Sequence, residues 1–204
     1  MKTEGNMIEL PAPETSGGIS VEKAINQRRS VREYTGNPPG IKEISQLLWA
    51  AQGITGANGN KRAAPSAGMT YPLEVYLIAG DKIENLQGIY KYEPEQHSLK
   101  KRSSEDSRKA LSNAGLRQES IKEAPAVIVI TAVVGRTVSR YPTQGERYVF
   151  MEAGHAAQNM YLQCESLGLG MVVIGAFGGN DVKNVLQLPE KEKPLYIIPF
   201  GNTE

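Results

Sequence analysis

The sequence predicts helices packed around one β-sheet, which is an α+β or α/β protein. Segments with helical and with strand-like apolar spacing alternate along the chain. Residues 126–134 (AVIVITAVV) form a β-branched apolar run, which is typical of a central strand buried on both faces. Residues 144–167 give the longest helix candidate, and residues 195–200 give a strand at the very end.

The N-terminal part predicts an arm and two helices. Residues 1–18 are polar and rich in proline and glycine, so we expect an extended arm before a single domain over residues 19–204. Ser20 is a candidate N-cap for a helix of about two turns. A second helix is expected to end at Gly53, because apolar residues recur at helical spacing at Ile41, Ile44, Leu47, Leu48 and Ala51.

The remaining segments are expected to complete the sheet and its cover. Residues 53–71 are glycine-rich and predict a long loop, which in a compact domain is usually functional or disordered. Residues 88–115 are polar and charged and predict a variable surface excursion with room for one helix. The other expected elements are a strand at 72–79, a strand at 171–174 and a short helix at 181–186.

Charge and cysteine content exclude several classes of partner and site. The 204 residues carry 23 Lys and Arg against 22 Asp and Glu, so we expect neither nucleic acid nor an anionic membrane as partner. No stretch reaches the ~20 apolar residues of a membrane-spanning helix, and the N-terminus lacks the apolar core of a signal peptide. The one cysteine, Cys164, excludes an internal disulfide and suits a reducing cytoplasm.

The first segment that could carry chemistry is Arg28-Arg29-Ser30-Val31-Arg32, at the end of the first predicted helix. Three guanidinium groups and a hydroxyl within five residues suit an anion such as a phosphate, which takes hydrogen bonds from several sides. Taken alone, the same charges are explained by the favourable interaction of cations with a helix C-terminus.

The second segment runs from Ala64 to Glu74 and leads directly into a predicted strand. Its small residues let the backbone approach a flat ligand, and the Ser66 hydroxyl can hydrogen-bond to it. An ordinary loop before a strand is the alternative.

The third segment, residues 173–181, is a strand that ends in a glycine-rich turn before a helix. Ligands of open α/β sheets collect where strands end, and Gly175 would expose a backbone N–H to a planar acceptor. The alternative is a plain strand-to-helix turn with Asp181 as N-cap. The segment is neither a GxGxxG fingerprint nor a Walker motif.

The long helix predicts no metal site and no hydrolytic triad. Glu152, His155 and Gln158 share one helical face, but the chain has only two histidines and no HExxH. We therefore expect His155 to be a hydrogen-bonded interior residue. No GxSxG elbow occurs either.

Taken together and in order, these segments resemble the nitroreductase superfamily. RRSVREY, PSAGMTYPLEVYLI, EAGHAAQNMYLQCESLGLGMVVIGAF and PLYIIPFG carry the resemblance over about residues 20–201. The branch they resemble most contains the SagB-type, thiazole- or oxazole-forming dehydrogenase domains. The resemblance implies an α+β fold with a central, mostly antiparallel mixed sheet flanked by helices. It also implies an intertwined homodimer with two FMN molecules at the interface.

The resemblance also implies roles for individual residues. Arg28 would hold the FMN phosphate, Ser30 and Arg32 would reach the polar edge of the isoalloxazine, and Arg29 would offer mainly backbone contacts. The partner subunit would supply Pro65, Ser66, Ala67 and Gly68. The strand end beside the ring would consist of Val173, Ile174, Gly175 and Ala176, with the Gly175 N–H near flavin N5.

One departure concerns the phosphate site. Many family members carry a basic residue after the last strand, whereas this chain ends Gly201-Asn202-Thr203-Glu204. Either another cation assists Arg28 or FMN is held less tightly; the candidates are Lys61, Arg62 and Arg147.

Three functions stay open at this point. The first is ping-pong hydride transfer from NAD(P)H through flavin N5 to a nitroaromatic, quinone or similar small acceptor, with no separate catalytic side chain. The second is azoline dehydrogenation of a modified peptide, for which Lys91 and Tyr92 match the Lys/Tyr pair of the SagB group only loosely. The third is a flavin-binding protein that stores or senses FMN without turnover.

Overall fold

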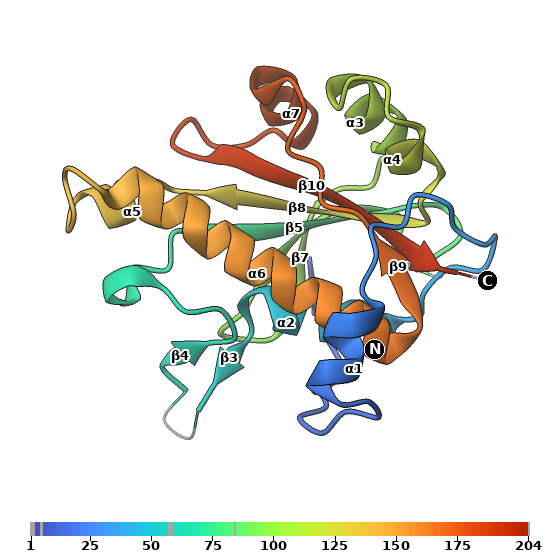
Figure 1. Cartoon of the computed structure of the whole chain (residues 1–204). Helices are drawn as coiled ribbons and strands as arrows, with labels where there is room; N and C mark the ends of the chain where they lie inside the picture. The colour runs from blue at the N-terminus through green and yellow to red at the C-terminus, as the bar shows by residue number, and fades with distance from the viewer. Residues whose placement is uncertain (1–2, 5, 57–58, 84, 204) are drawn as a thin grey trace.

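The chain folds around one eight-stranded antiparallel sheet (Figure 1). The computed structural model describes residues 3–4, 6–56, 59–83 and 85–203. The strand order is β1-β2-β7-β6-β5-β8-β10-β9, and every pairing between them is antiparallel. This confirms the α+β class. The strands are β1 Thr3–Glu4, β2 Met7–Glu9, β5 Leu73–Ala79, β6 Gly88–Glu93, β7 Ser98–Ser103, β8 Ala126–Ala132, β9 Leu169–Met171 and β10 Lys193–Asn202.

Helices cover both faces of the sheet (Figure 1). On one face lie α2 and the long helix α6, with α1 packed on α6 and α5 leading into it. On the other face lie α3, α4 and α7. The helices are α1 Val21–Gln27, α2 Ile41–Gln52, α3 Arg108–Ala114, α4 Glu119–Glu123, α5 Gly135–Val138, α6 Gly145–Leu167 and α7 Gly179–Leu186.

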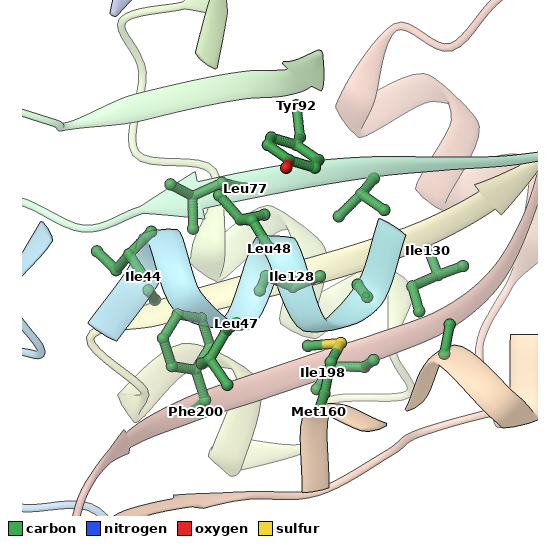
Figure 2. Packing of buried hydrophobic residues seen from close by; sticks show 14 of the residues in the cluster. Ile44, Leu47, Leu48, Leu77, Tyr92, Ile128, Ile130, Met160, Ile198 and Phe200 are labelled. Atoms are coloured by element: carbon green, nitrogen blue, oxygen red, sulfur yellow. The ribbon is translucent and has the colours of Figure 1, made fainter. Parts of the chain in front are cut away.

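Strand β8 lies at the centre of the core and is buried on both faces, as its sequence predicts. Because side chains alternate along a strand, Ile128 and Ile130 face α2 and α6, whereas Val127 and Val129 face the other helix layer. Figure 2 shows the first of these layers, with Leu48 of α2 beside Leu77 of β5.

Local signals set the helix ends where the sequence predicts them. The Ser20 hydroxyl caps α1 by accepting the N–H of Lys23 at 3.2 Å. The N–H of Gly53 ends α2 on the carbonyl of Trp49. Gly168 ends α6 in the left-handed conformation, with φ of 69°, which glycine adopts without strain.

The largest correction concerns residues 88–115, which are not a surface excursion. They form the hairpin of β6 and β7 and then the one helix expected there, α3. Tyr90 and Tyr92 of β6 are 1% exposed and pack into the main core. The polarity that misled the prediction belongs to β7, whose Lys100 and Arg102 point out of the sheet toward solvent.

Four smaller predictions also differ from the structure. Residues 53–71 contain a short hairpin, β3 Ile54–Thr55 with β4 Lys61–Arg62, and a 3-10 turn at Ala67–Met69, so the segment is not a plain loop. The strand expected at 171–174 lies at Leu169–Met171. Gly178, and not Asp181, is the N-cap of α7.

The fourth difference is in the N-terminal arm, of which residues 1, 2 and 5 lie outside the described part. Its residues Met7–Glu9 pair with β7 and add a strand to the sheet. Over the described residues, no helix has the length and apolarity needed to cross a membrane.

Replacing Leu48 by alanine tests the core. Leu48 is fully buried between α2 and the sheet, so Leu48→Ala is expected to lower the free energy of unfolding by about 2–5 kcal/mol. Leu116→Ala is the matched control, since Leu116 is 66% exposed, and should change it by less than about 0.5 kcal/mol. Urea unfolding followed by circular dichroism measures both; equal effects would contradict this packing.

Candidate functional site

The candidate site begins at the free edge of the sheet beyond β9. Ile174 donates to and accepts from Ile197 of β10, so its backbone is paired inward. Neighbouring residues of an antiparallel strand point their N–H groups to opposite sides, and Val173 therefore faces outward. Its N–H donates to the Tyr161 hydroxyl of α6 at 3.0 Å.

Gly175 repeats this outward direction two residues further on. Among the described residues no acceptor lies within hydrogen-bond reach of its N–H, and the residue is exposed. A Cβ at this position would meet only Tyr196 Cε1, at 3.8 Å, so the protein itself leaves room there. The edge therefore presents a free donor on the same side as Tyr161.

The arginine segment lies against this edge. The N–H of Val31 donates to the carbonyl of Met171 at 2.9 Å, which fixes the segment next to the end of β9. The Ser30 hydroxyl lies 3.0 Å from the Tyr161 hydroxyl. The Arg28 guanidinium lies 4.9 Å from the centre of the Tyr161 ring, a cation–π distance. The first and third predicted segments therefore meet at Tyr161.

The three arginines of the segment have different surroundings. Arg29 donates from Nη1 to the carbonyls of three residues at the end of α1 (Asn26, Gln27 and Arg28). This side chain therefore caps the C-terminus of the helix, which is the alternative to phosphate binding given by the sequence. Arg28 and Arg32 form no ion pair with any described residue. Two guanidinium groups without an ion pair, in a segment fixed next to the free edge of the sheet, suit an anionic ligand with hydrogen-bond acceptors.

The second predicted segment lies elsewhere in the same chain. Ser66 is close to Glu152 in the first half of α6, and Gly68 packs against Arg140 and Tyr141. Nine residues of helix, a rise of about 14 Å, separate Glu152 from Tyr161. One chain therefore brings the first and third segments together and holds Pro65, Ser66, Ala67 and Gly68 at a second position along α6.

Glu152 is a buried acid that the sequence prediction considered only as a metal ligand. It is 2% exposed, and neither carboxyl oxygen has a hydrogen-bond partner among the described residues. Burial raises its pKa to about 7, while the Ser66 hydroxyl and the charge of Arg62 lower it by less. The group therefore changes charge near neutral pH.

His155 corrects another prediction, because it is exposed and has no hydrogen bond to a described residue. The buried face of α6 runs through Val149, Ala153, Ala156 and Met160, and position 155 lies outside it. Phe150 and Met151 are also exposed, at 45% and 44%, so α6 is buried on one face only. Glu152 and His155 consequently lie in different environments.

The three cations suggested as helpers of Arg28 at the FMN phosphate differ in whether other contacts already engage them. Arg62 is already engaged, with Glu95 at 2.6 Å and the Gln52 carbonyl at 3.1 Å. Arg147 is exposed on α6, about 21 Å of helical rise from Tyr161, so it cannot join Arg28 of its own chain. Lys61 is exposed on β4. Glu204 lies outside the described residues.

Lys91 and Tyr92 are both committed to structural contacts. Lys91 pairs with Glu74 at 2.9 Å, and the Tyr92 hydroxyl lies 2.8 Å from His97 Nδ1 in the core. Burial also raises the pKa of Tyr92, which keeps its hydroxyl protonated. The pair does not face a ligand in this arrangement.

Sequence reasoning missed the two side chains on which this arrangement depends. Tyr161 follows the apolar spacing of the long helix, and nothing in its position along the sequence distinguishes it. Glu152 does leave a trace, because an acid three residues after Val149 and four before Ala156 lies on the buried stripe. An unexplained charge on such a stripe is a signal of function or of a buried network.

The fold is that of an α+β protein, and its candidate ligand site lies at the free edge of the sheet, next to the arginine segment. The family model described as the Nitroreductase family matches residues 25–202. The chain therefore belongs to the nitroreductase family, which confirms the resemblance seen in the sequence and makes the protein an oxidoreductase of that type.

Similar proteins agree with this assignment. The chain is 43% identical over 197 residues to the candidate nitroreductase MJ1384 of Methanocaldococcus jannaschii, covering 97% of this chain and 98% of that protein. The crystal structure of a candidate nitroreductase from Ralstonia eutropha matches with a TM-score of 0.85 at 32% identity, covering 100% of this chain and 92% of that one. The microcin B17-processing protein McbC of Escherichia coli is 26% identical over 172 residues, 81% of this chain and 63% of that protein, which supports the SagB-type branch loosely.

Changing Glu152 to glutamine tests the buried acid. Because its pKa is about 7 in the folded protein against an ordinary 4.5, the folded state binds this proton more tightly than the unfolded chain. That stabilisation is fully present below pH 4.5 and is lost as the pH rises through 7. In the wild type the free energy of unfolding should therefore fall by on the order of 3 kcal/mol between about pH 4.5 and 8, and in Glu152→Gln this fall should be absent.

The measurement is urea unfolding of both proteins across that pH range. Glu190→Gln, at an exposed carboxyl, is the control and should follow the wild type. Parallel pH profiles for wild type and Glu152→Gln would contradict the buried, unpartnered state of this acid.

Proposed function

We propose that this protein is an FMN-dependent NAD(P)H oxidoreductase that reduces nitroaromatic, quinone or similar small organic acceptors. The observation that carries the proposal is the free sheet edge, where Tyr161 contacts Arg28, Ser30 and the outward N–H of Val173. Gly175 follows two residues later with no hydrogen bond to a described residue, and Arg28 forms no ion pair with one. Family membership gives the reaction class.

The residues at the edge fit FMN. Its phosphate needs a guanidinium, for which Arg28 is free, and its ring system needs backbone donors and a wall without a Cβ, which Gly175 supplies. Bound FMN would supply the hydride chemistry of a ping-pong reaction between NAD(P)H and the acceptor.

The side chains at the edge bind and orient, and they balance charge. We assign Arg28 to the phosphate and Arg32 to the N1–C2 edge of the ring, where a cation stabilises the negative charge that accumulates on reduction. Gly175 aligns N5 through its N–H. No side chain of this chain is required as acid or base for hydride transfer itself.

We further propose that the site is completed by a second copy of the chain. Pro65, Ser66, Ala67 and Gly68 lie away from the Arg28 cluster within one chain, which agrees with their supply from a partner subunit. The exposed Phe150 and Met151 on α6 also support a homodimer contact along that helix.

Azoline dehydrogenation is the second candidate, because the chain resembles McbC, a microcin B17-processing protein. The buried Tyr92 and the Lys91–Glu74 ion pair weigh against it. A flavin-storing protein is the third candidate, and turnover distinguishes it from the other two.

The absorption spectrum tests the proposal directly. The purified protein, or the protein after addition of FMN, is expected to absorb near 370 and 450 nm (approximate values for any oxidised flavin) and to bleach when NADPH or NADH is added without oxygen. Subsequent addition of a quinone should restore the bands. A flavin that neither nucleotide reduces would favour the peptide or storage function, and a protein that refuses FMN would overturn the proposal.

Replacing Gly175 by alanine tests the ring contact. The protein alone accommodates the added methyl, whose nearest neighbour is Tyr196 Cε1 at 3.8 Å, so the fold should be unaffected. If the flavin passes beside this N–H, the methyl must collide with it and weaken FMN binding about tenfold or more. Gly135→Ala, where a Cβ meets nothing within 4 Å, is the control. Wild-type FMN affinity in Gly175→Ala would disprove the assigned contact.

A further inference from the structure

Tyr161 joins three parts of the site that are distant in sequence. Its hydroxyl contacts Ser30 Oγ and the N–H of Val173, both at 3.0 Å, and its ring carries the Arg28 guanidinium at 4.9 Å. The residue is half-buried on α6, one turn before the fully buried Cys164. A rigid helix thus holds a loop and a strand end in one fixed relation.

One of the two hydrogen bonds at this junction has a fixed direction. A backbone N–H only donates, so the Tyr161 oxygen accepts from Val173. In the bond to Ser30 either hydroxyl can donate, and Ser30 Oγ is the acceptor that the described residues offer the Tyr161 proton. When Tyr161 donates in this bond, Ser30 keeps its own proton for a group outside the chain, and Ser30 is exposed.

We propose that Tyr161 is a positioning residue that turns the Ser30 hydroxyl into an oriented hydrogen-bond donor for the ligand and seats the Arg28 guanidinium on its ring. The chain of donors runs from the Val173 N–H through Tyr161 to Ser30 and on to an acceptor atom of the ligand. This inference rests on the proposed function, in which that acceptor is the polar edge of the flavin ring.

The consequence is electrostatic as well as geometric. Hydrogen bonds that follow one another polarise each other, so a donor that itself accepts a bond is a stronger donor. Negative charge gathers at the N1–C2 edge when the ring is reduced, and a strengthened Ser30 donor stabilises that charged form over the neutral one. Tyr161 should therefore raise both the affinity for the ring and its midpoint potential.

Tyr161→Phe isolates the hydroxyl, because the ring under Arg28 is kept. Apo-protein is titrated with FMN and with riboflavin, which lacks the phosphate, and the midpoint potential of the bound flavin is measured. We expect affinity for both ligands to fall by the same factor, about three- to tenfold, and the potential to become more negative. Arg28→Ala, in contrast, should weaken FMN far more than riboflavin.

A double-mutant cycle separates this role from a merely structural one. In a Ser30→Ala background, Tyr161→Phe should cause little further loss of riboflavin affinity, since both changes break the same chain of donors. Tyr148→Phe is the matched control: it removes another hydroxyl from α6, one that donates to Gln144 Oε1 and lies outside the junction. It should leave affinity and potential unchanged.

The outcomes distinguish the inference from the function on which it rests. If the wild type binds and reduces flavin but Tyr161→Phe equals it, or if the losses with Ser30→Ala simply add, the inference is wrong and the proposed function stands. If the wild type binds no flavin, the inference and the proposed function are both wrong. Should Tyr161→Phe fail to fold, Ser30→Ala, at an exposed loop position, carries the test with the same expected losses.

Discussion

The candidate site depends on one constraint: backbone N–H groups at the free edge of the sheet need hydrogen-bond acceptors. Beyond β9 the chain keeps pairing with β10 through Ile174, and this pairing turns the N–H groups of Val173 and Gly175 outward. One of them is satisfied by Tyr161, and the other has no hydrogen bond to a described residue. An unpaired donor at a sheet edge is otherwise a liability, so its retention on the edge where Tyr161 holds Arg28 and Ser30 agrees with the proposed ligand site.

Helix α6 carries two different polar side chains toward two different segments. Tyr161 in its second half organises the arginine segment, and the buried Glu152 in its first half lies beneath the Ser66 segment. In the proposed dimer each flavin would contact the second half of α6 from one subunit and the Ser66 segment of the other. One rigid helix would then fix the distance between the two half-sites. Loops alone would fix that distance less accurately.

Much of the fold follows from local patterns in the sequence. The caps of α1 and α6, the apolar stripe of α2 and the continuous burial of β8 all arise from neighbouring residues, and each lies where its pattern predicts. The β6–β7 hairpin was missed because β7 is polar. Its formation as a strand depends on pairing with β2 and β6 more than on its own composition.

The sequence by itself determined the family, the main helices, the central strands and the three segments that could touch a ligand, because these depend on residue type and spacing. Only the tertiary structure decided that two segments meet at Tyr161, that Ser66 lies with a buried Glu152, and that Arg62, Lys91 and Tyr92 are engaged elsewhere. Side-chain contacts across 12 to 131 residues are set by how α6 crosses the sheet, and no local pattern encodes that crossing.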